Sequence, residues 1–147
     1  MSSSSKRILF VCYANACRSQ MAEGFARALG PEDLEVQSAG IMAAGLFGET
    51  VASMAQVGID ISQQTSKTVN QLDLSSYDLI VTLSDQAHTQ LRRRHPELSM
   101  LHHPVLDPAG VAGTYEERMK IFNLTREDIR GVVLEVLAQV ARESKRA

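Results

Sequence analysis

The chain has little of what would point to several common classes of protein. Its 147 residues carry a formal net charge of −2, so no strong basic field favours a nucleic acid as partner. No apolar run approaches the roughly 20 residues that span a membrane, and the opening MSSSSKR lacks the apolar segment of a secretion signal. We therefore expect a cytoplasmic protein that engages neither nucleic acid nor membrane.

Cysteine is scarce as well. The chain has only two, Cys12 and Cys17, which is too few for a disulfide framework or for a structural zinc site. Two cysteines in a cytosolic protein are more often reduced, catalytic or redox-active than structural. The four histidines show no paired ligand spacing, so we predict no metal and no other cofactor; they are His88, His95, His102 and His103.

The apolar pattern predicts one α/β domain. Short apolar runs at 8–11, 34–38, 79–83 and 100–102 are typical of buried strands, and helical patterns lie between and after them. This alternation indicates a single-domain four-stranded parallel sheet with helices on both faces. We place the domain at 7–143, between a flexible N-terminal tail at 1–6 and a C-terminal tail at 144–147.

Several signals fix helix ends. The residues at 85–94 are predicted to form a helix that stops before Pro96. The segments Thr114–Glu117 and Thr125–Asp128 share the Thr-x-x-acid pattern of a helix start, so two helix starts are predicted there. An apolar stripe over 129–140 indicates the last helix.

The stretch FVCYANACRSQ, residues 10–20, joins the first predicted strand to a helix. Such a loop offers backbone N–H groups that the helix leaves unpaired, and with the helix dipole these groups bind a tetrahedral oxyanion. Arg18 adds a planar fork of donors suited to two oxygens of phosphate. The predicted oxyanion-binding residues are Tyr13, Ala14, Asn15, Ala16, Cys17 and Arg18.

Cys12 is then a candidate nucleophile. A free thiol has a pKa of ~8.5, and helix N-termini and nearby cations lower such values to ~3.5–7.5, which makes the thiolate the dominant form. Ser19 is placed to hydrogen-bond the sulfur, and Asn15 is suited to hold the loop in shape. A buried packing role or a redox pair with Cys17 are the alternatives, and the Cys-x5-Arg-Ser spacing favours catalysis.

Attack on a phosphate ester expels a leaving group that needs a proton, and the loop itself contains no acid. Asp107 follows the fourth predicted strand, so it belongs to the same edge of the sheet and is our candidate general acid. Its alternative role is an Asp-Pro turn with Pro108. Asp85 and Asp78 are weaker candidates, since Asp85 falls in the predicted first turn of a helix.

The segment VCYANACRS resembles the catalytic loop of the low-molecular-weight protein tyrosine phosphatases and of the arsenate reductases that share their fold. The SAG at Ser38–Gly40 and the Asp-Pro pair at 107–108 fall where that family has its other signatures. The resemblance implies a four-stranded parallel sheet, with Cys12 as nucleophile, Arg18 as oxyanion clamp and Asp107 as general acid. It also implies loop support from Asn15 and Ser19.

Different features of the sequence point to different branches of this family. The segments SQMAEGF and DPAGVAGTYEE look like the reductase branch, and Gln20 and Ala109 stand where the phosphatases usually have proline and an aromatic residue. Reductases coupled to thioredoxin use further cysteines, and Ser84 and Leu91 stand where these would be expected. In the phosphatases, two cysteines at the positions that match Cys12 and Cys17 can close a reversible disulfide.

We therefore weigh three hypotheses. The first is a phosphatase of the tyrosine type that hydrolyses a phosphate monoester or a phosphoprotein through a phosphocysteine. The second is an arsenate reductase that uses Cys12 with Cys17 or with an external reductant: glutaredoxin, thioredoxin or a small thiol. The third is a non-catalytic oxyanion-binding or redox-sensing protein.

Overall fold

Four parallel strands form the centre of the structure, a computed structural model that describes residues 6–146. They are β1 (Arg7–Cys12), β2 (Glu35–Gly40), β3 (Leu79–Thr82) and β4 (Met100–His102). The strands lie in the order β2-β1-β3-β4, and every neighbouring pair is parallel. The predicted four-stranded parallel sheet is confirmed.

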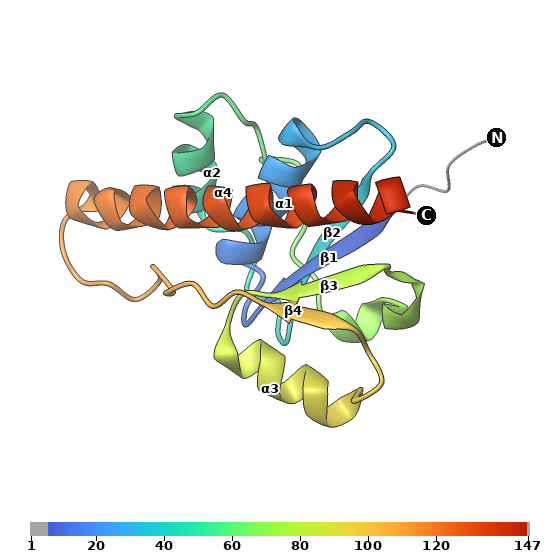
Figure 1. Cartoon of the computed structure of the whole chain (residues 1–147). Helices are drawn as coiled ribbons and strands as arrows, with labels where there is room; N and C mark the ends of the chain where they lie inside the picture. Colours follow the sequence, from blue (N-terminus) through green and yellow to red (C-terminus); the bar gives the residue numbers. More distant parts are fainter. Residues whose placement is uncertain (1–5, 147) are drawn as a thin grey trace.

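Helices cover both faces of this sheet. In Figure 1, α1 (Arg18–Leu29), α2 (Gly48–Ala55) and α4 (Tyr115–Arg146) lie on one side and α3 (Asp85–Arg94) on the other. Two short 3-10 turns, η1 (Val69–Gln71) and η2 (Leu74–Ser76), lead into β3. The doubly covered α/β architecture is therefore as predicted.

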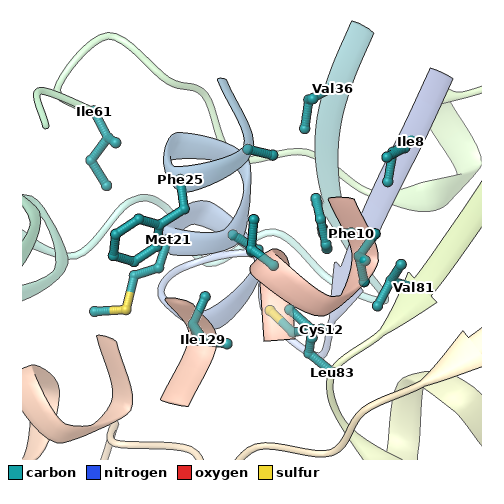
Figure 2. Packing of buried hydrophobic residues seen from close by; sticks show 14 of the residues in the cluster. Ile8, Phe10, Cys12, Met21, Phe25, Val36, Ile61, Val81, Leu83 and Ile129 are labelled. Atoms are coloured by element: carbon teal, nitrogen blue, oxygen red, sulfur yellow. The ribbon is translucent and has the colours of Figure 1, made fainter. Parts of the chain in front are cut away.

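The side chains of β1 alternate between two apolar clusters because successive residues of a strand point to opposite faces. Phe10 packs with Phe25 of α1 and Ile129 of α4 in the larger cluster (Figure 2). Leu9 packs in the cluster that contains Leu91 of α3. β1 is thus buried on both faces, as expected for a central parallel strand.

The carboxyl ends of all four strands meet at one edge of the sheet. Cys12 is paired with Gly40 of β2, and Thr82 of β3 is paired with His102 of β4. The chain leaves β1 for one neighbour and later returns to its other side, so the switch point of the sheet lies between β1 and β3. Ligands of open α/β sheets bind at this place.

Most of the predicted helix ends are confirmed. The Ser84 hydroxyl accepts a hydrogen bond from the Ala87 N–H at 3.1 Å and caps α3, which ends at Arg94 before Pro96. Thr114 caps α4: its hydroxyl accepts from the Glu117 N–H at 3.1 Å.

The second predicted helix start, at Thr125–Asp128, is wrong. Thr125 lies inside α4, and its hydroxyl donates back to the Ile121 carbonyl oxygen at 3.0 Å. A Thr-x-x-acid pattern caps a helix only where the chain enters from a loop, because only there are the first backbone N–H groups unpaired. The turn before Thr125 is already helical.

At the ends of the described range, Lys6 accepts a backbone hydrogen bond from Glu35 at 2.9 Å, and α4 continues to Arg146. The helix therefore runs into the segment predicted as a C-terminal tail, and the rest of the predicted N-terminal tail, residues 1–5, lies outside the described residues. None of the helices within 6–146 combines the length and apolar character needed to cross a bilayer.

Candidate active site

Cys12 is the last residue of β1, and its side chain lies at the base of the larger apolar cluster beside Leu83 (Figure 2). Only 2% of the residue is exposed. Its sulfur lies within hydrogen-bond distance of the Ser19 hydroxyl, at 2.9 Å. The structure thus brings together the predicted nucleophile and the residue predicted to hydrogen-bond its sulfur.

Asn15 holds the loop in a sharp bend. It is fully buried and has a φ of 48°, the left-handed conformation that asparagine tolerates. Its side-chain N–H groups donate to the hydroxyls of Ser19 at 2.8 Å and Ser38 at 3.0 Å. Its side-chain oxygen accepts from the Lys67 N–H at 2.8 Å and from the Gln20 amide at 3.2 Å. All four interactions fix the loop from beneath.

A buried polar layer supports Asn15. The Ser38 hydroxyl donates to the Glu23 carboxylate at 2.6 Å, and Arg27, one helical turn away on α1, pairs with the same carboxylate at 2.6 Å. The Gln20 amide also donates to the Thr65 carbonyl oxygen at 3.0 Å. Of this layer, the sequence singled out Ser38, as part of the SAG segment, and Gln20, as a departure from the phosphatase pattern, but it assigned neither residue to a buried network.

The carbonyl groups of the loop are tied to the chain that follows β2. Those of Tyr13 and Ala14 accept from the N–H groups of Met42 at 2.9 Å and Ala44 at 3.0 Å. Within the described residues, no backbone N–H group of 13–17 donates to a protein acceptor. The loop therefore keeps a row of unpaired N–H donors, as an oxyanion cradle requires.

Gly40 allows this close approach. A Cβ at this position would stand 2.3 Å from the Met42 carbonyl oxygen, 2.7 Å from the Asn15 nitrogen and 2.8 Å from the Tyr13 carbonyl oxygen. Any larger residue would push the loop away from β2. The glycine of the SAG segment is therefore a packing requirement of the loop.

Arg18 connects the loop to the segment after β4. Its side chain is 8% exposed; one terminal nitrogen donates to the Val105 carbonyl oxygen at 3.0 Å, and the other lies 3.4 Å from the Asp107 carboxylate. Asp107 is half exposed and also accepts from the Ala109 N–H at 3.0 Å. Both residues line a cleft of about 340 Å³ that opens to solvent.

The second cysteine of the loop, Cys17, is buried where α1 begins. Burial raises the pKa of its thiol to about 12, although a hydrogen bond with Thr50 lowers this pKa. Thr50, on α2, also donates to the Ala16 carbonyl oxygen at 2.9 Å. Both cysteines are free thiols, so a disulfide between Cys12 and Cys17 stays a prediction.

Two histidines that are distant in sequence meet beside this edge of the sheet. The rings of His88 and His102 stack with centroids 4.3 Å apart, and an Nδ1 of each lies within 3.0 Å of the Thr82 hydroxyl. His102 also pairs with Asp85. In the described part of the chain, no group of three or more histidine, cysteine or acidic side chains is arranged to hold a metal ion.

In this chain, a loop of unpaired backbone N–H donors joins Cys12 to Arg18, and the Asp107 carboxylate lies beside Arg18. The model of the low molecular weight phosphotyrosine protein phosphatases matches residues 7–146. The chain belongs to this family.

The similar proteins divide between two activities. The chain is 42% identical to an arsenate reductase of Bacillus subtilis (strain 168) over 124 residues, which cover 84% of this chain and 89% of that protein. A solved low molecular weight protein tyrosine phosphatase from T. tengcongensis is 30% identical with a TM-score of 0.77, covering 92% of this chain and 99% of that one. A solved arsenate reductase in a phosphate-binding state is also 30% identical, with a TM-score of 0.74 and coverage of 91% and 98%. This chain is therefore a cysteine-based enzyme of the phosphatase and arsenate reductase kind, and its substrate is a phosphate-like oxyanion.

Proposed function

We propose that this chain is a phosphatase that hydrolyses phosphate monoesters through a phosphocysteine on Cys12. The state of Cys17 carries the proposal. With a pKa of about 12 and almost no exposure, Cys17 is a protonated thiol at neutral pH and a slow nucleophile. Hydrolysis needs only one reactive thiol and water, whereas arsenate reduction within this chain needs a second thiol to attack the first.

In the first step, the Cys12 thiolate attacks phosphorus in line with the leaving group. The S–P bond forms as the P–O bond breaks, and the N–H groups of 13–17 with Arg18 stabilise the equatorial oxygens. The departing oxygen takes a proton from Asp107. The 3.4 Å separation of Arg18 and Asp107 supports these roles, because it places the acid beside the group that holds the phosphoryl oxygens.

In the second step, water attacks phosphorus and Asp107 accepts its proton. The S–P bond breaks, phosphate leaves and the thiolate is restored. The Ser19 hydroxyl, 2.9 Å from the sulfur, hydrogen-bonds the thiolate as it departs. No metal or organic cofactor is needed for either step.

The substrate is a phosphate monoester without a strict preference for phosphotyrosine. Ala109 follows the Asp-Pro pair, and no aromatic side chain lines the cleft within the described residues. A phosphoprotein remains within this class. We also propose that the enzyme acts in the cytoplasm, since its two free thiols are typical of a reducing compartment.

A second candidate is an arsenate reductase that takes its electrons from an external thiol. The 42% identity to the arsenate reductase of Bacillus subtilis favours it. Arsenate has the shape and charge of phosphate, so the same loop would hold it while Cys12 forms the thiol adduct. Glutathione with glutaredoxin, or thioredoxin, would then supply the second thiol that Cys17 is too buried to provide.

A paired assay tests the proposal. The purified chain is offered para-nitrophenyl phosphate without reductant, and separately arsenate with glutathione and glutaredoxin or with thioredoxin and its reductase. We expect phosphate release in the first assay, with burst formation of phosphocysteine that mass spectrometry locates on Cys12. Arsenite formation without ester hydrolysis would overturn the phosphatase proposal in favour of the reductase.

A further inference from the structure

The cleft that contains Arg18 and Asp107 has a second carboxylate on its wall. Asp85, the first residue of α3, lines the same space of about 340 Å³. The rest of the wall is formed by the neighbours of these residues: Ser84, Gln86, Pro104, Val105 and Leu106. Because Asp107 gives its proton to the leaving group, this cleft is where the leaving group of the substrate lies.

Asp85 is held in place although it is exposed. Its side chain is 85% accessible, yet one carboxylate oxygen lies 2.8 Å from Nε2 of His102. The other ring nitrogen of His102 lies 2.8 Å from the hydroxyl of Thr82, which is fully buried in β3. Most exposed carboxylates move freely, whereas this one is fixed through a histidine to the centre of the sheet.

One carboxylate dominates the charge that faces the leaving group. Among the described residues that line the cleft, Arg18 is the one basic residue, and in the proposed mechanism its guanidinium holds the phosphoryl oxygens. Asp107 is protonated when it acts as the general acid, which leaves the carboxylate of Asp85. His88 lies near Asp85. Burial lowers the pKa of the His88 ring, and the neighbouring His102 and Arg92 lower it further, so this ring adds no positive charge at neutral pH.

We propose that Asp85 is a specificity-determining residue that selects substrates whose leaving group carries a positive charge. The substrate class is a phosphate monoester with an ammonium or guanidinium group on the leaving side, near enough to reach the far wall of the cleft. A cation there meets the fixed carboxylate of Asp85, while an acidic leaving group is repelled by the same carboxylate. His102 is a positioning residue that keeps the Asp85 carboxylate at the wall. This inference rests on the proposed phosphatase function.

A helix-capping role alone does not account for this arrangement. An acid in the first turn of a helix is favourable because of the helix dipole, and Asp85 has that position. That role stabilises the fold and is indifferent to the substrate. A measurement of selectivity between leaving groups therefore separates the two roles, because losing the interaction with the helix dipole would not change that selectivity.

The experiment compares para-aminomethylphenyl phosphate, which is cationic, with the neutral para-hydroxymethylphenyl phosphate. The ratio of their kcat/KM values is measured for the wild type, Asp85→Asn, His102→Gln and Glu97→Gln. Glu97 is the matched control: it is also an exposed carboxylate near a histidine, 3.7 Å from His95, but it lies beyond the other end of α3.

We expect the ratio of cationic to neutral substrate to fall about two- to fivefold in Asp85→Asn, as is typical of losing an exposed ion pair. A smaller fall is expected in His102→Gln and none in Glu97→Gln. For the wild type, raising the ionic strength from about 0.01 to about 1 M should also reduce the ratio, because the screening length drops from about 30 to about 3 Å.

An unchanged ratio in folded Asp85→Asn, or a wild-type ratio that salt does not alter, would overturn the selection of cations. Either result leaves ester hydrolysis itself intact. Failure of the wild type to hydrolyse both esters would instead reject the phosphatase function on which the inference rests.

Discussion

Thr50 of α2 donates a hydrogen bond to the carbonyl oxygen of Ala16, 2.9 Å away, and so joins a helix that carries no reacting group to the loop that follows Cys12. Thr50 is fully buried, and its hydroxyl also bonds the Cys17 thiol. One side chain therefore fixes both the backbone and the second thiol of the loop.

Thr50→Val should lower the free energy of unfolding by about 1–3 kcal/mol, because the Ala16 carbonyl oxygen loses this buried donor. The valine keeps the shape but not the hydroxyl. Urea unfolding measures the loss, and Thr50→Ser, which retains the hydroxyl, should recover most of it. A Thr50→Val protein as stable as the wild type would show that the Phe47 N–H, which also bonds this carbonyl at 3.2 Å, is sufficient.

Cys12→Ser should abolish hydrolysis while the protein stays folded. The hydroxyl is nearly isosteric with the thiol but ionises far less readily, so the nucleophile is lost. Circular dichroism checks the fold, and phosphate release checks activity. Arg18→Lys is a companion variant that should also be severely impaired, since lysine offers a point charge in place of a planar fork. Normal turnover in folded Cys12→Ser would remove Cys12 from the chemistry.

Asp107→Asn should slow poor leaving groups far more than good ones. A general acid contributes about 10²–10⁴-fold when the departing oxygen needs a proton. Phenyl phosphate should therefore lose much more rate than para-nitrophenyl phosphate. Equal losses for the two esters would indicate that Asp107 serves only the turn with Pro108 and Ala109.

The burial of Cys17 predicts a loss of stability at alkaline pH. Its thiol ionises near 9.0 in a solvated chain and at about 12 in the folded protein. Between these values the unfolded state releases the proton first, so the free energy of unfolding is unaffected below pH 9 and falls above it. The slope is at most about 1.4 kcal/mol per pH unit.

Cys17→Ala removes this contribution, so its unfolding free energy should fall less steeply from pH 9 upward than that of the wild type. Denaturant unfolding across this range makes the comparison. Parallel curves for the two proteins would mean that the Cys17 thiol ionises alike in the folded and unfolded states.

Cys12 and Cys17 should close a disulfide under mild peroxide. Cys12, the proposed nucleophile, is the first site of oxidation, giving a sulfenic acid that condenses with the Cys17 thiol and releases water. Mass spectrometry should find a loss of two hydrogens that dithiothreitol reverses. Overoxidised Cys12 beside a free Cys17 thiol would reject the pair.

The sequence predicted the parts of this protein that depend on neighbouring residues. Apolar runs located the four strands, and the Cys-x5-Arg-Ser spacing located the loop, because a strand, a turn and a helix start are local structures. The same reasoning failed at Thr125, where a local pattern is the same inside a helix as at its start. Only the packing of α4 onto α1 decides that the helix is continuous there.

Contacts between distant segments could not be predicted in this way. The burial of Glu23 beneath Ser38, and the bond from Thr50 to Ala16, join residues on separate elements. The stacking of His88 on His102 was missed because their separation in sequence matches no ligand motif. Each of these contacts follows from how the helices lie on the sheet, which no short pattern specifies.

Gly40 leaves no room for even one carbon atom between β2 and the loop, so the hole that receives the oxyanion is walled by backbone on that side. Its dimensions are therefore the same for whatever molecule enters, and no exchange of side chains at that wall can widen it for a larger group. Differences in substrate among related chains must then come from residues on the other side of the opening, at positions such as Leu106, which is 88% exposed. Engineering for a new substrate should therefore keep Gly40 and the loop unchanged and randomise exposed positions at the opening such as Leu106.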